Sequence, residues 1–265
     1  MGIKKLTIIM SYNLNNPHQY NNNGHNSGNY NIGGQPGGTF EAPVQISSRE
    51  VAEYVSKVFG WMFVGLLLTA VSSLVAALVP QVQELLMTSK FLFLGLILVN
   101  FGIVVFISAR FTRMNYATLL GSFLAYSVIN GIVLSFIFSV YDFRVITTSF
   151  TVTAVTFGIM AIAGYTTKTD LTKFGRLLMM ALVGIIIASL VNLFLGSETL
   201  YWIVSYVGVA VFVGLIAYDT QKVKSYAMIP DAEMRKKAGI MGALSLYLDF
   251  INLFMFILRI FGNRR

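Results

Sequence analysis

The sequence has no cysteine, only two histidines and few charged residues, and each shortage excludes a class of function. Without cysteine there can be no disulfide framework, thiol nucleophile or thiolate metal site, and the redox compartment stays undetermined. Charged residues make up 11% of the chain and hydrophobic residues 56%, a balance that a soluble domain cannot bury. Both histidines, His18 and His25, lie in a polar N-terminal stretch, so Ser–His catalysis and histidine-bound zinc are not expected in the apolar part.

The apolar residues come in blocks of about twenty, the length at which a helix crosses a lipid bilayer. We count seven such spans, at residues 56–79, 90–110, 115–140, 145–166, 174–196, 200–223 and 239–261. Short segments with turn-forming and charged residues separate them. The sequence therefore predicts an all-α membrane protein with seven transmembrane helices within residues 48–265.

The N-terminal residues 1–47 have a different composition, rich in Asn and Gly and poor in apolar side chains. Such a segment cannot bury enough apolar surface to fold, so we expect a disordered tail. Two isolated imidazoles in a flexible tract are usually solvated, and we assign no role to His18 and His25.

Lys and Arg residues indicate the orientation of the spans. Most of them flank one side, which also holds the N-terminus, and only Lys90 and Arg144 are predicted on the other. Because basic loops stay inside, the N-terminus is expected in the cytoplasm and the end of a seventh full span outside. Arg259, Arg264 and Arg265 would also suit a re-entrant last segment, but we favour the full span. The net charge of +8 arises from such flanking residues, so nucleic-acid binding is not expected.

Of the eleven acidic residues, only Asp219 and Asp249 lie well inside predicted spans. A charge at that depth costs about 3 kcal/mol or more in lipid, so intramembrane carboxylates are usually functional. The sixth span runs inward and the seventh runs back, which places both side chains at similar depth. Two neighbouring carboxylates in a low dielectric cannot both be charged cheaply, and the pair is expected to act as a proton switch. The alternative is a structural hydrogen bond between two helices.

Three other polar residues are candidates for the same site. Ser245 and Asn252 share a helix face with Asp249, at spacings of four and three residues. Arg110 ends the second span at the same depth as the aspartates, where it could pair with one of them. The alternative is an interfacial arginine that marks the end of a helix.

Deprotonated, Asp219 and Asp249 could also hold a cation such as Ca²⁺ transiently. They supply at most four oxygens of the roughly six to eight that Ca²⁺ prefers, leaving the rest to water, Asn252 or backbone carbonyls. Such weak binding suits a permeant ion. No phosphate-binding glycine loop is present, and we expect neither a cofactor nor an enzyme. The one catalytic alternative is an intramembrane aspartyl protease, whose second motif we do not find.

Three motifs carry a resemblance to a known family. They read Ser245-Leu-Tyr-Leu-Asp249-Phe-Ile-Asn252-Leu-Phe, Gly214-Leu-Ile-Ala-Tyr218-Asp219-Thr-Gln221-Lys222-Val-Lys224 and Gly164-Tyr-Thr-Thr-Lys168-Thr-Asp170-Leu. Over about residues 48–265 the chain resembles the transmembrane Bax inhibitor motif family, especially its bacterial branch. The resemblance implies a seven-helix fold whose last helix is central between two three-helix layers, in the bacterial inner membrane.

The resemblance also implies a function, a pH-sensitive Ca²⁺ leak. Asp219 and Asp249 match the family's proton-sensing pair, and Arg110 best matches the arginine that pairs with them in the closed form. One position departs from the pattern: bacterial members often carry a glutamate where this chain has Asn100, so a cation path through that carboxylate would be altered. Two alternatives stay open, a non-conducting regulator of other membrane proteins and a proton-coupled solute carrier.

Overall fold

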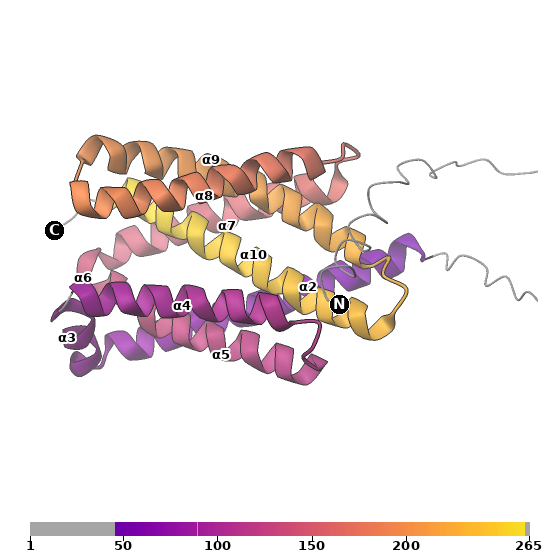
Figure 1. Cartoon of the computed structure of the whole chain (residues 1–265), viewed down its shortest axis with the longest axis horizontal. Helices are drawn as coiled ribbons and strands as arrows, with labels where there is room; N and C mark the ends of the chain where they lie inside the picture. Colours follow the sequence, from indigo (N-terminus) through magenta and orange to yellow (C-terminus); the bar gives the residue numbers. More distant parts are fainter. Residues whose placement is uncertain (1–45, 89, 263–265) are drawn as a thin grey trace, which may run out of the picture. The chain divides into compact units, whose positions relative to one another are not determined.

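The computed structural model describes residues 46–88 and 90–262, and all regular secondary structure in these ranges is helical. The helices are α2 (Ser48–Ala77), α3 (Pro80–Thr88), α4 (Lys90–Arg110), α5 (Tyr116–Leu134), α6 (Ile137–Val140), α7 (Phe143–Thr166), α8 (Thr172–Leu195), α9 (Glu198–Tyr226) and α10 (Ala232–Phe261) (Figure 1). The all-α fold class is therefore confirmed. The predicted tail, residues 1–47, lies outside the described residues except for its last two positions.

Six helices in the described ranges are long and apolar enough to cross a membrane. They are α2, α7, α8, α9, α10 and the continuous segment formed by α5 and α6. The second predicted span falls on α4, whose shorter apolar part is Leu94–Arg110. The last span is one continuous helix of 30 residues, about 45 Å long at the usual rise. That length favours a full crossing over a re-entrant segment.

Helix α10 lies between two groups of helices, α2, α4 and α5 on one side and α7, α8 and α9 on the other (Figure 1). It packs mainly against α9, α2, α7 and α5. Leu246, Tyr247 and Leu253 on this helix are completely buried, whereas α8 exposes most of its apolar side chains. The predicted central position of the last helix is confirmed.

The boundaries of three helices follow from local conformation and hydrogen bonding. Ser47 and Glu50 form a capping box that starts α2, with the Ser47 amide donating to Glu50 Oε2 at 2.8 Å. Gly196 ends α8 in the left-handed conformation (φ 64°), which glycine adopts without strain. Ser197 then caps α9 at once, accepting from the Leu200 amide. The result is a tight turn between α8 and α9.

A buried chain of hydrogen bonds connects α10 to α2, α5 and α4. The Tyr247 hydroxyl accepts from Asn130 Nδ2 of α5 and lies 2.7 Å from the Thr69 hydroxyl of α2. Asn100 on α4 extends the chain by donating to Asn130 Oδ1 at 2.9 Å. Because lipid offers no competing partners, such bonds fix the relative positions of helices. This network joins α4 to α5 and the centre of the fold.

Glycine allows α9 to approach its neighbours closely. A Cβ on Gly208 would lie 2.6 Å from the Phe256 ring of α10, and a Cβ on Gly164 of α7 would meet the backbone of Ala217 on α9. Small residues at such crossings are typical of membrane helices.

Replacing Gly164 by alanine should force α7 away from α9, since the backbone of Ala217 cannot yield as a flexible side chain would. We expect Gly164→Ala to lower the free energy of unfolding by about 1–3 kcal/mol, measured in mixed micelles of rising dodecyl sulfate content. Gly158→Ala, on the same helix and with open space around its Cβ, is the matched control and should be neutral or slightly stabilising. Equal stability of the two variants would contradict this packing.

Candidate functional site

The crossing of α9 and α10 brings Asp219 and Asp249 together. Their carboxyl groups lie close enough to interact directly, as the antiparallel course of the two helices led us to expect. Asp249 is only 6% exposed, and Asp219 is partly buried. Two acidic side chains from different helices thus share one site inside the apolar core.

Asp249 has unsatisfied hydrogen-bonding capacity. Within the described part of the chain, its Oδ2 atom is buried and has no hydrogen-bond partner. A buried carboxylate oxygen without a donor is costly, and native structures usually keep such a group for a functional reason. A proton or a cation at this oxygen would satisfy it.

The two polar neighbours on α10 contribute little to this site. Asn252 donates its amide to the carbonyl of Leu248 on its own helix, at 2.8 Å. Ser245 is partly exposed, and neither side chain forms a hydrogen bond with Asp249 in residues 46–88 and 90–262. The three residues share a helix face as predicted, and Asp249 is the one whose side chain interacts with Asp219 of α9.

Arg110 lies apart from the aspartates. It is exposed, its guanidinium sits 5.2 Å from the centre of the Phe106 ring, and it forms no ion pair with a described residue. The physical reason is the packing of α4, which lies mainly against α5 and α3. The structure therefore does not bring Arg110 to the pair and places it as an interfacial arginine at a helix end.

Lys222 is a positively charged residue whose field acts on both carboxyl groups. It was not among the site residues predicted from the sequence. It lies one turn after Asp219, and its charge acts on both carboxylates without a direct ion pair to a described residue. Its ammonium group also faces the Tyr218 ring at 5.8 Å. The spacing of three residues between Asp219 and Lys222 is the signal that could have identified it.

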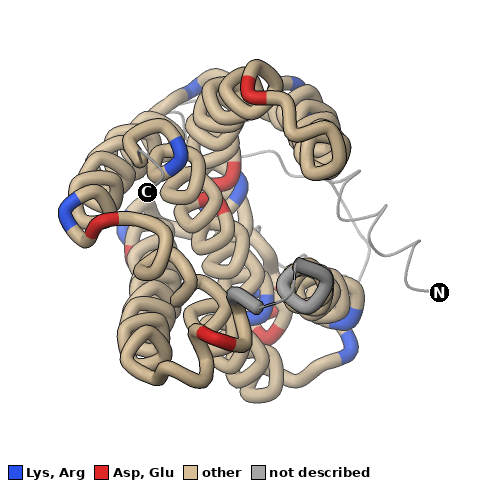
Figure 2. The backbone as a smooth tube through the Cα atoms, turned by 90° about the vertical axis from the view of Figure 1, so that its left-hand side faces the viewer, with Lys and Arg blue, Asp and Glu red and all other residues tan. Residues whose placement is uncertain are grey.

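Charged residues are otherwise mostly peripheral. Figure 2 looks along the helices from the end at which α10 finishes, and shows red and blue segments mainly around the rim. A few of them appear near the middle of this view. Asp249 and Lys237 are the buried charged residues in the described ranges. Interior charges are the exception that membrane proteins keep for function.

Polar side chains after Asp219 hold the loop between α7 and α8. Gln221 accepts from the Leu171 amide at 2.9 Å and donates to the Thr169 carbonyl at 2.8 Å. Lys224 donates to the Tyr165 carbonyl at 3.0 Å. Two of the sequence motifs thus contact each other, and their polar residues fix the end of α9 next to the aspartates.

Asp170 in this loop behaves as an ordinary surface carboxylate. Its Oδ1 atom accepts from the Thr172 hydroxyl at 2.6 Å and from the Thr172 amide at 2.9 Å, which lowers the pKa of Asp170 below its usual 3.8. The stabilisation is present at neutral pH and is lost only as the pH falls through this lowered pKa. Asp170 therefore cannot produce a response near neutral pH.

A resident metal centre finds little support. No group of three or more His, Cys, Asp or Glu side chains gathers within the described ranges. Asp219 and Asp249 alone offer too few oxygens to hold Ca²⁺ tightly. The site fits a group that binds protons, or a cation in passing.

Comparison with known proteins identifies the family. The family model described as "inhibitor of apoptosis-promoting Bax1" matches residues 51–265, most of the chain. The chain belongs to this Bax inhibitor family. The resemblance noted in the sequence motifs is thereby confirmed.

Bacterial relatives match about four fifths of this Bax inhibitor family protein. Inner membrane protein YbhL of Escherichia coli K12 is 50% identical over 215 residues, which cover 80% of this chain and 92% of YbhL. An uncharacterised protein of Borreliella burgdorferi is 41% identical and covers 80% of this chain and 93% of its own. An uncharacterised protein of Rickettsia prowazekii is 41% identical over 80% of this chain and 90% of its own length. The chain is accordingly a multi-pass integral membrane protein.

Replacing Asp249 by asparagine tests whether its carboxylate stabilises the fold. The amide removes a charge beside Asp219 and supplies a donor toward it. We therefore expect the free energy of unfolding of Asp249→Asn at pH 7, measured by titration with dodecyl sulfate, to equal that of the wild type or to exceed it by up to about 1 kcal/mol. Asp231→Asn, which keeps the N-cap of α10, is the control and should be neutral. A loss of about 2 kcal/mol or more in Asp249→Asn would instead indicate a structural hydrogen bond between helices.

Proposed function

We propose that this protein is a pH-sensitive cation leak, with Ca²⁺ as the permeant ion and the Asp219–Asp249 pair as its proton-sensitive gate. The observation that carries the proposal is the buried pair with one carboxylate oxygen unsatisfied. Stability alone does not explain such a pair, because two buried carboxylates cost free energy that an apolar pair would not. The proposed function is transport and not catalysis, and it needs no cofactor.

The pair can change state because its two charges interact strongly at short range. With one proton shared, the carboxyl groups attract each other and hold α9 against α10. Without it, two negative charges repel each other and attract a cation from the nearer aqueous side. Lys222 moderates that field, since its ammonium group acts on both carboxylates. Protons and cations therefore compete for one site.

Arg110 enters the proposal through a movement of α4. In the described conformation Arg110 is remote from the pair, so a closed state in which it contacts Asp219 or Asp249 requires α4 to shift toward α9 and α10. The packing of α4, mainly against α5, leaves that helix less constrained than α10. Protonation of the pair would weaken its hold on Arg110 and open the path, so we expect flux to rise as pH falls.

The orientation supports regulation from the cytoplasm. Arg110, Lys168, Lys224 and Arg235 all lie at the end of the fold where α2 and α10 begin. Because basic residues tend to stay inside, we propose that this end of the helices faces the cytoplasm, as expected from the sequence. We propose the bacterial inner membrane as the location, in line with the name of the YbhL relative.

The flux assay uses purified protein in liposomes loaded with a Ca²⁺ indicator, across pH 5 to 8. Wild-type flux should vary with pH by up to about tenfold per unit, the limit for a single proton switch. Asp219→Asn and Asp249→Asn should each weaken the response of flux to pH or move it to another pH range, because the one carboxyl group that remains no longer has a charged carboxylate beside it. Asp231→Asn, at the surface, should keep the wild-type response.

The outcomes of this assay separate the candidate functions. A normal pH response in both aspartate variants would contradict the gate. Absence of Ca²⁺ flux in the wild type would favour a non-conducting regulator, and purification with a specific membrane protein would then identify its target. Uptake of a small solute by counterflow would favour the proton-coupled carrier.

Arg110→Gln tests the contribution of α4 to closure. If Arg110 contacts the carboxylates in the closed state, its loss should raise flux at pH 8 toward the level measured at pH 6. Arg113→Gln, three residues further and also exposed, is the matched control. Equal, low flux at pH 8 in both variants would remove Arg110 from the mechanism and leave the carboxyl pair as the gate.

A further inference from the structure

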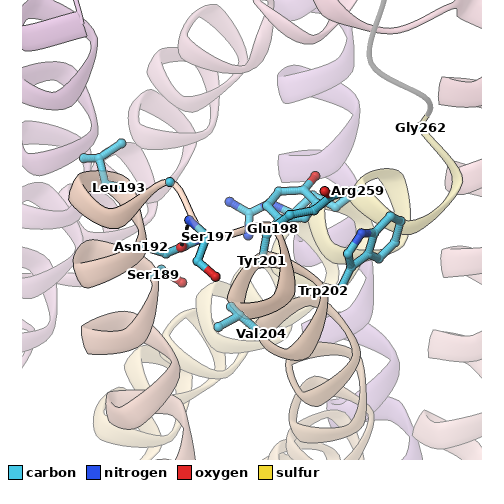
Figure 3. A pocket seen from close by; sticks show the side chains of 11 residues that line it. Ser189, Asn192, Leu193, Ser197, Glu198, Tyr201, Trp202, Val204, Arg259 and Gly262 are labelled. Carbon is cyan, nitrogen blue, oxygen red and sulfur yellow. Dashed lines mark hydrogen bonds between the residues drawn. The ribbon is translucent and has the colours of Figure 1, made fainter.

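A polar cavity lies at the end of the fold where α8 ends, α9 begins and α10 finishes, away from Lys222 and Arg110. Its volume is ≈ 520 Å³. The polar and aromatic residues that line it include Asn192, Ser197, Glu198, Tyr201, Trp202 and Arg259. Figure 3 shows Asn192 and Ser197 on one side of the cavity and Arg259, Tyr201 and Trp202 on the other. The tight turn at Gly196 forms part of the wall.

A positive and a negative side chain, Arg259 and Glu198, line the cavity and form no ion pair with each other. The Arg259 guanidinium lies 5.3 Å from the Tyr201 ring centre and 5.5 Å from that of Phe256, and it forms no ion pair within residues 46–88 and 90–262. Glu198 lines the same cavity at the first turn of α9. Neither Arg259 nor Glu198 has an ion-pair partner among the described residues, so both charges can face a ligand.

An apolar groove continues from this cavity between α8 and α9. It measures ≈ 260 Å³ and shares Val204 with the polar cavity. On α8 the groove is lined by Ala181, Gly184 and Ala188, which are small residues three or four positions apart. Leu200, Ile203 and Val207 of α9 form its other wall. The groove therefore runs from the beginning of α9 toward the middle of the membrane.

We propose that the cavity and groove together bind one phospholipid with an ethanolamine headgroup. The phosphate would lie at Arg259, whose planar guanidinium suits phosphate oxygens. The ammonium group would lie between the Glu198 carboxylate and the Trp202 ring, which attracts cations. One acyl chain would occupy the groove beside Gly184.

Charge and position favour this ligand over others. Tyr201 and Trp202 form an aromatic pair at the helix end, and Trp202 stacks on Tyr206, as aromatic residues do at the membrane–water interface. An anionic headgroup such as phosphatidylglycerol would meet Arg259 equally well but would leave Glu198 without a positive partner. Glu198 therefore selects the zwitterionic lipid, independently of any role of the carboxyl pair in transport.

The test is native mass spectrometry of the full chain released from detergent, with palmitoyl-oleoyl phosphatidylethanolamine or phosphatidylglycerol added. We expect one tightly bound phosphatidylethanolamine, preferred over phosphatidylglycerol. Arg259→Gln should weaken binding of both lipids by roughly tenfold or more, the factor expected for one charge-assisted hydrogen bond. Glu198→Gln should abolish the preference between them.

Gly184→Leu tests the groove separately. A Cβ at Gly184 meets nothing within 4 Å, so the leucine fills the groove without disturbing the backbone, and binding of the intact lipid should fall by about tenfold. Gly121→Leu on α5, equally open, is the matched control and should bind as the wild type. Glycerophosphoethanolamine and inorganic phosphate, which lack acyl chains, should bind far more weakly than the lipid.

Three results would overturn the proposal. They are equal retention of both lipids by the wild type, unchanged binding in Arg259→Gln, and a free headgroup that binds as tightly as the intact lipid. Calcium flux in the same variants should keep its dependence on pH, which separates this site from the carboxyl pair.

Discussion

The structure depends on the burial of Asp249 at the centre of an apolar bundle. A carboxylate cannot face lipid at low cost, so the helix that carries it has to be surrounded by other helices. This explains why α10 lies between two layers and why it contacts α9, α2, α7 and α5. The same burial leaves Oδ2 of Asp249 without a described donor and makes Asp219 its immediate neighbour. Architecture and proposed function therefore have one cause.

Two kinds of contact keep this arrangement in place. On one side, Gly164 and Gly208 let α9 approach α7 and α10 closely enough to position Asp219. On the other, the Tyr247 hydroxyl joins α10 to α2 and α5 through hydrogen bonds that lipid cannot replace. Helix α4 is attached mainly through α5, which makes it the element best able to move while the centre stays fixed.

The helices and the carboxyl pair could be predicted from the sequence, whereas the surroundings of the pair could not. Apolar blocks indicate where helices run, and their alternating directions place Asp219 and Asp249 at one depth. Arg110 is predicted at the same depth, but depth alone does not determine which side of a helix faces the core. In the fold, α4 packs mainly against α5, and its Arg110 side chain is exposed beside Phe106. Charge counting treats Lys222 as a residue that flanks a span, whereas its spacing of three residues from Asp219 indicates a cation beside the pair. The cavity at Arg259 depends on three helix ends that only the fold brings together.

The central claim is that the Asp219–Asp249 pair gains and loses a proton over the pH range in which the protein responds. Infrared difference spectroscopy of the protein in lipid, titrated from pH 5 to 8, measures this directly through the carbonyl band of a protonated carboxyl group. We expect a band that changes over the same pH range as the flux, and that is weaker or titrates in a different range in both Asp219→Asn and Asp249→Asn. A band that persists unchanged in both variants, or no carboxyl titration within that range, would contradict it.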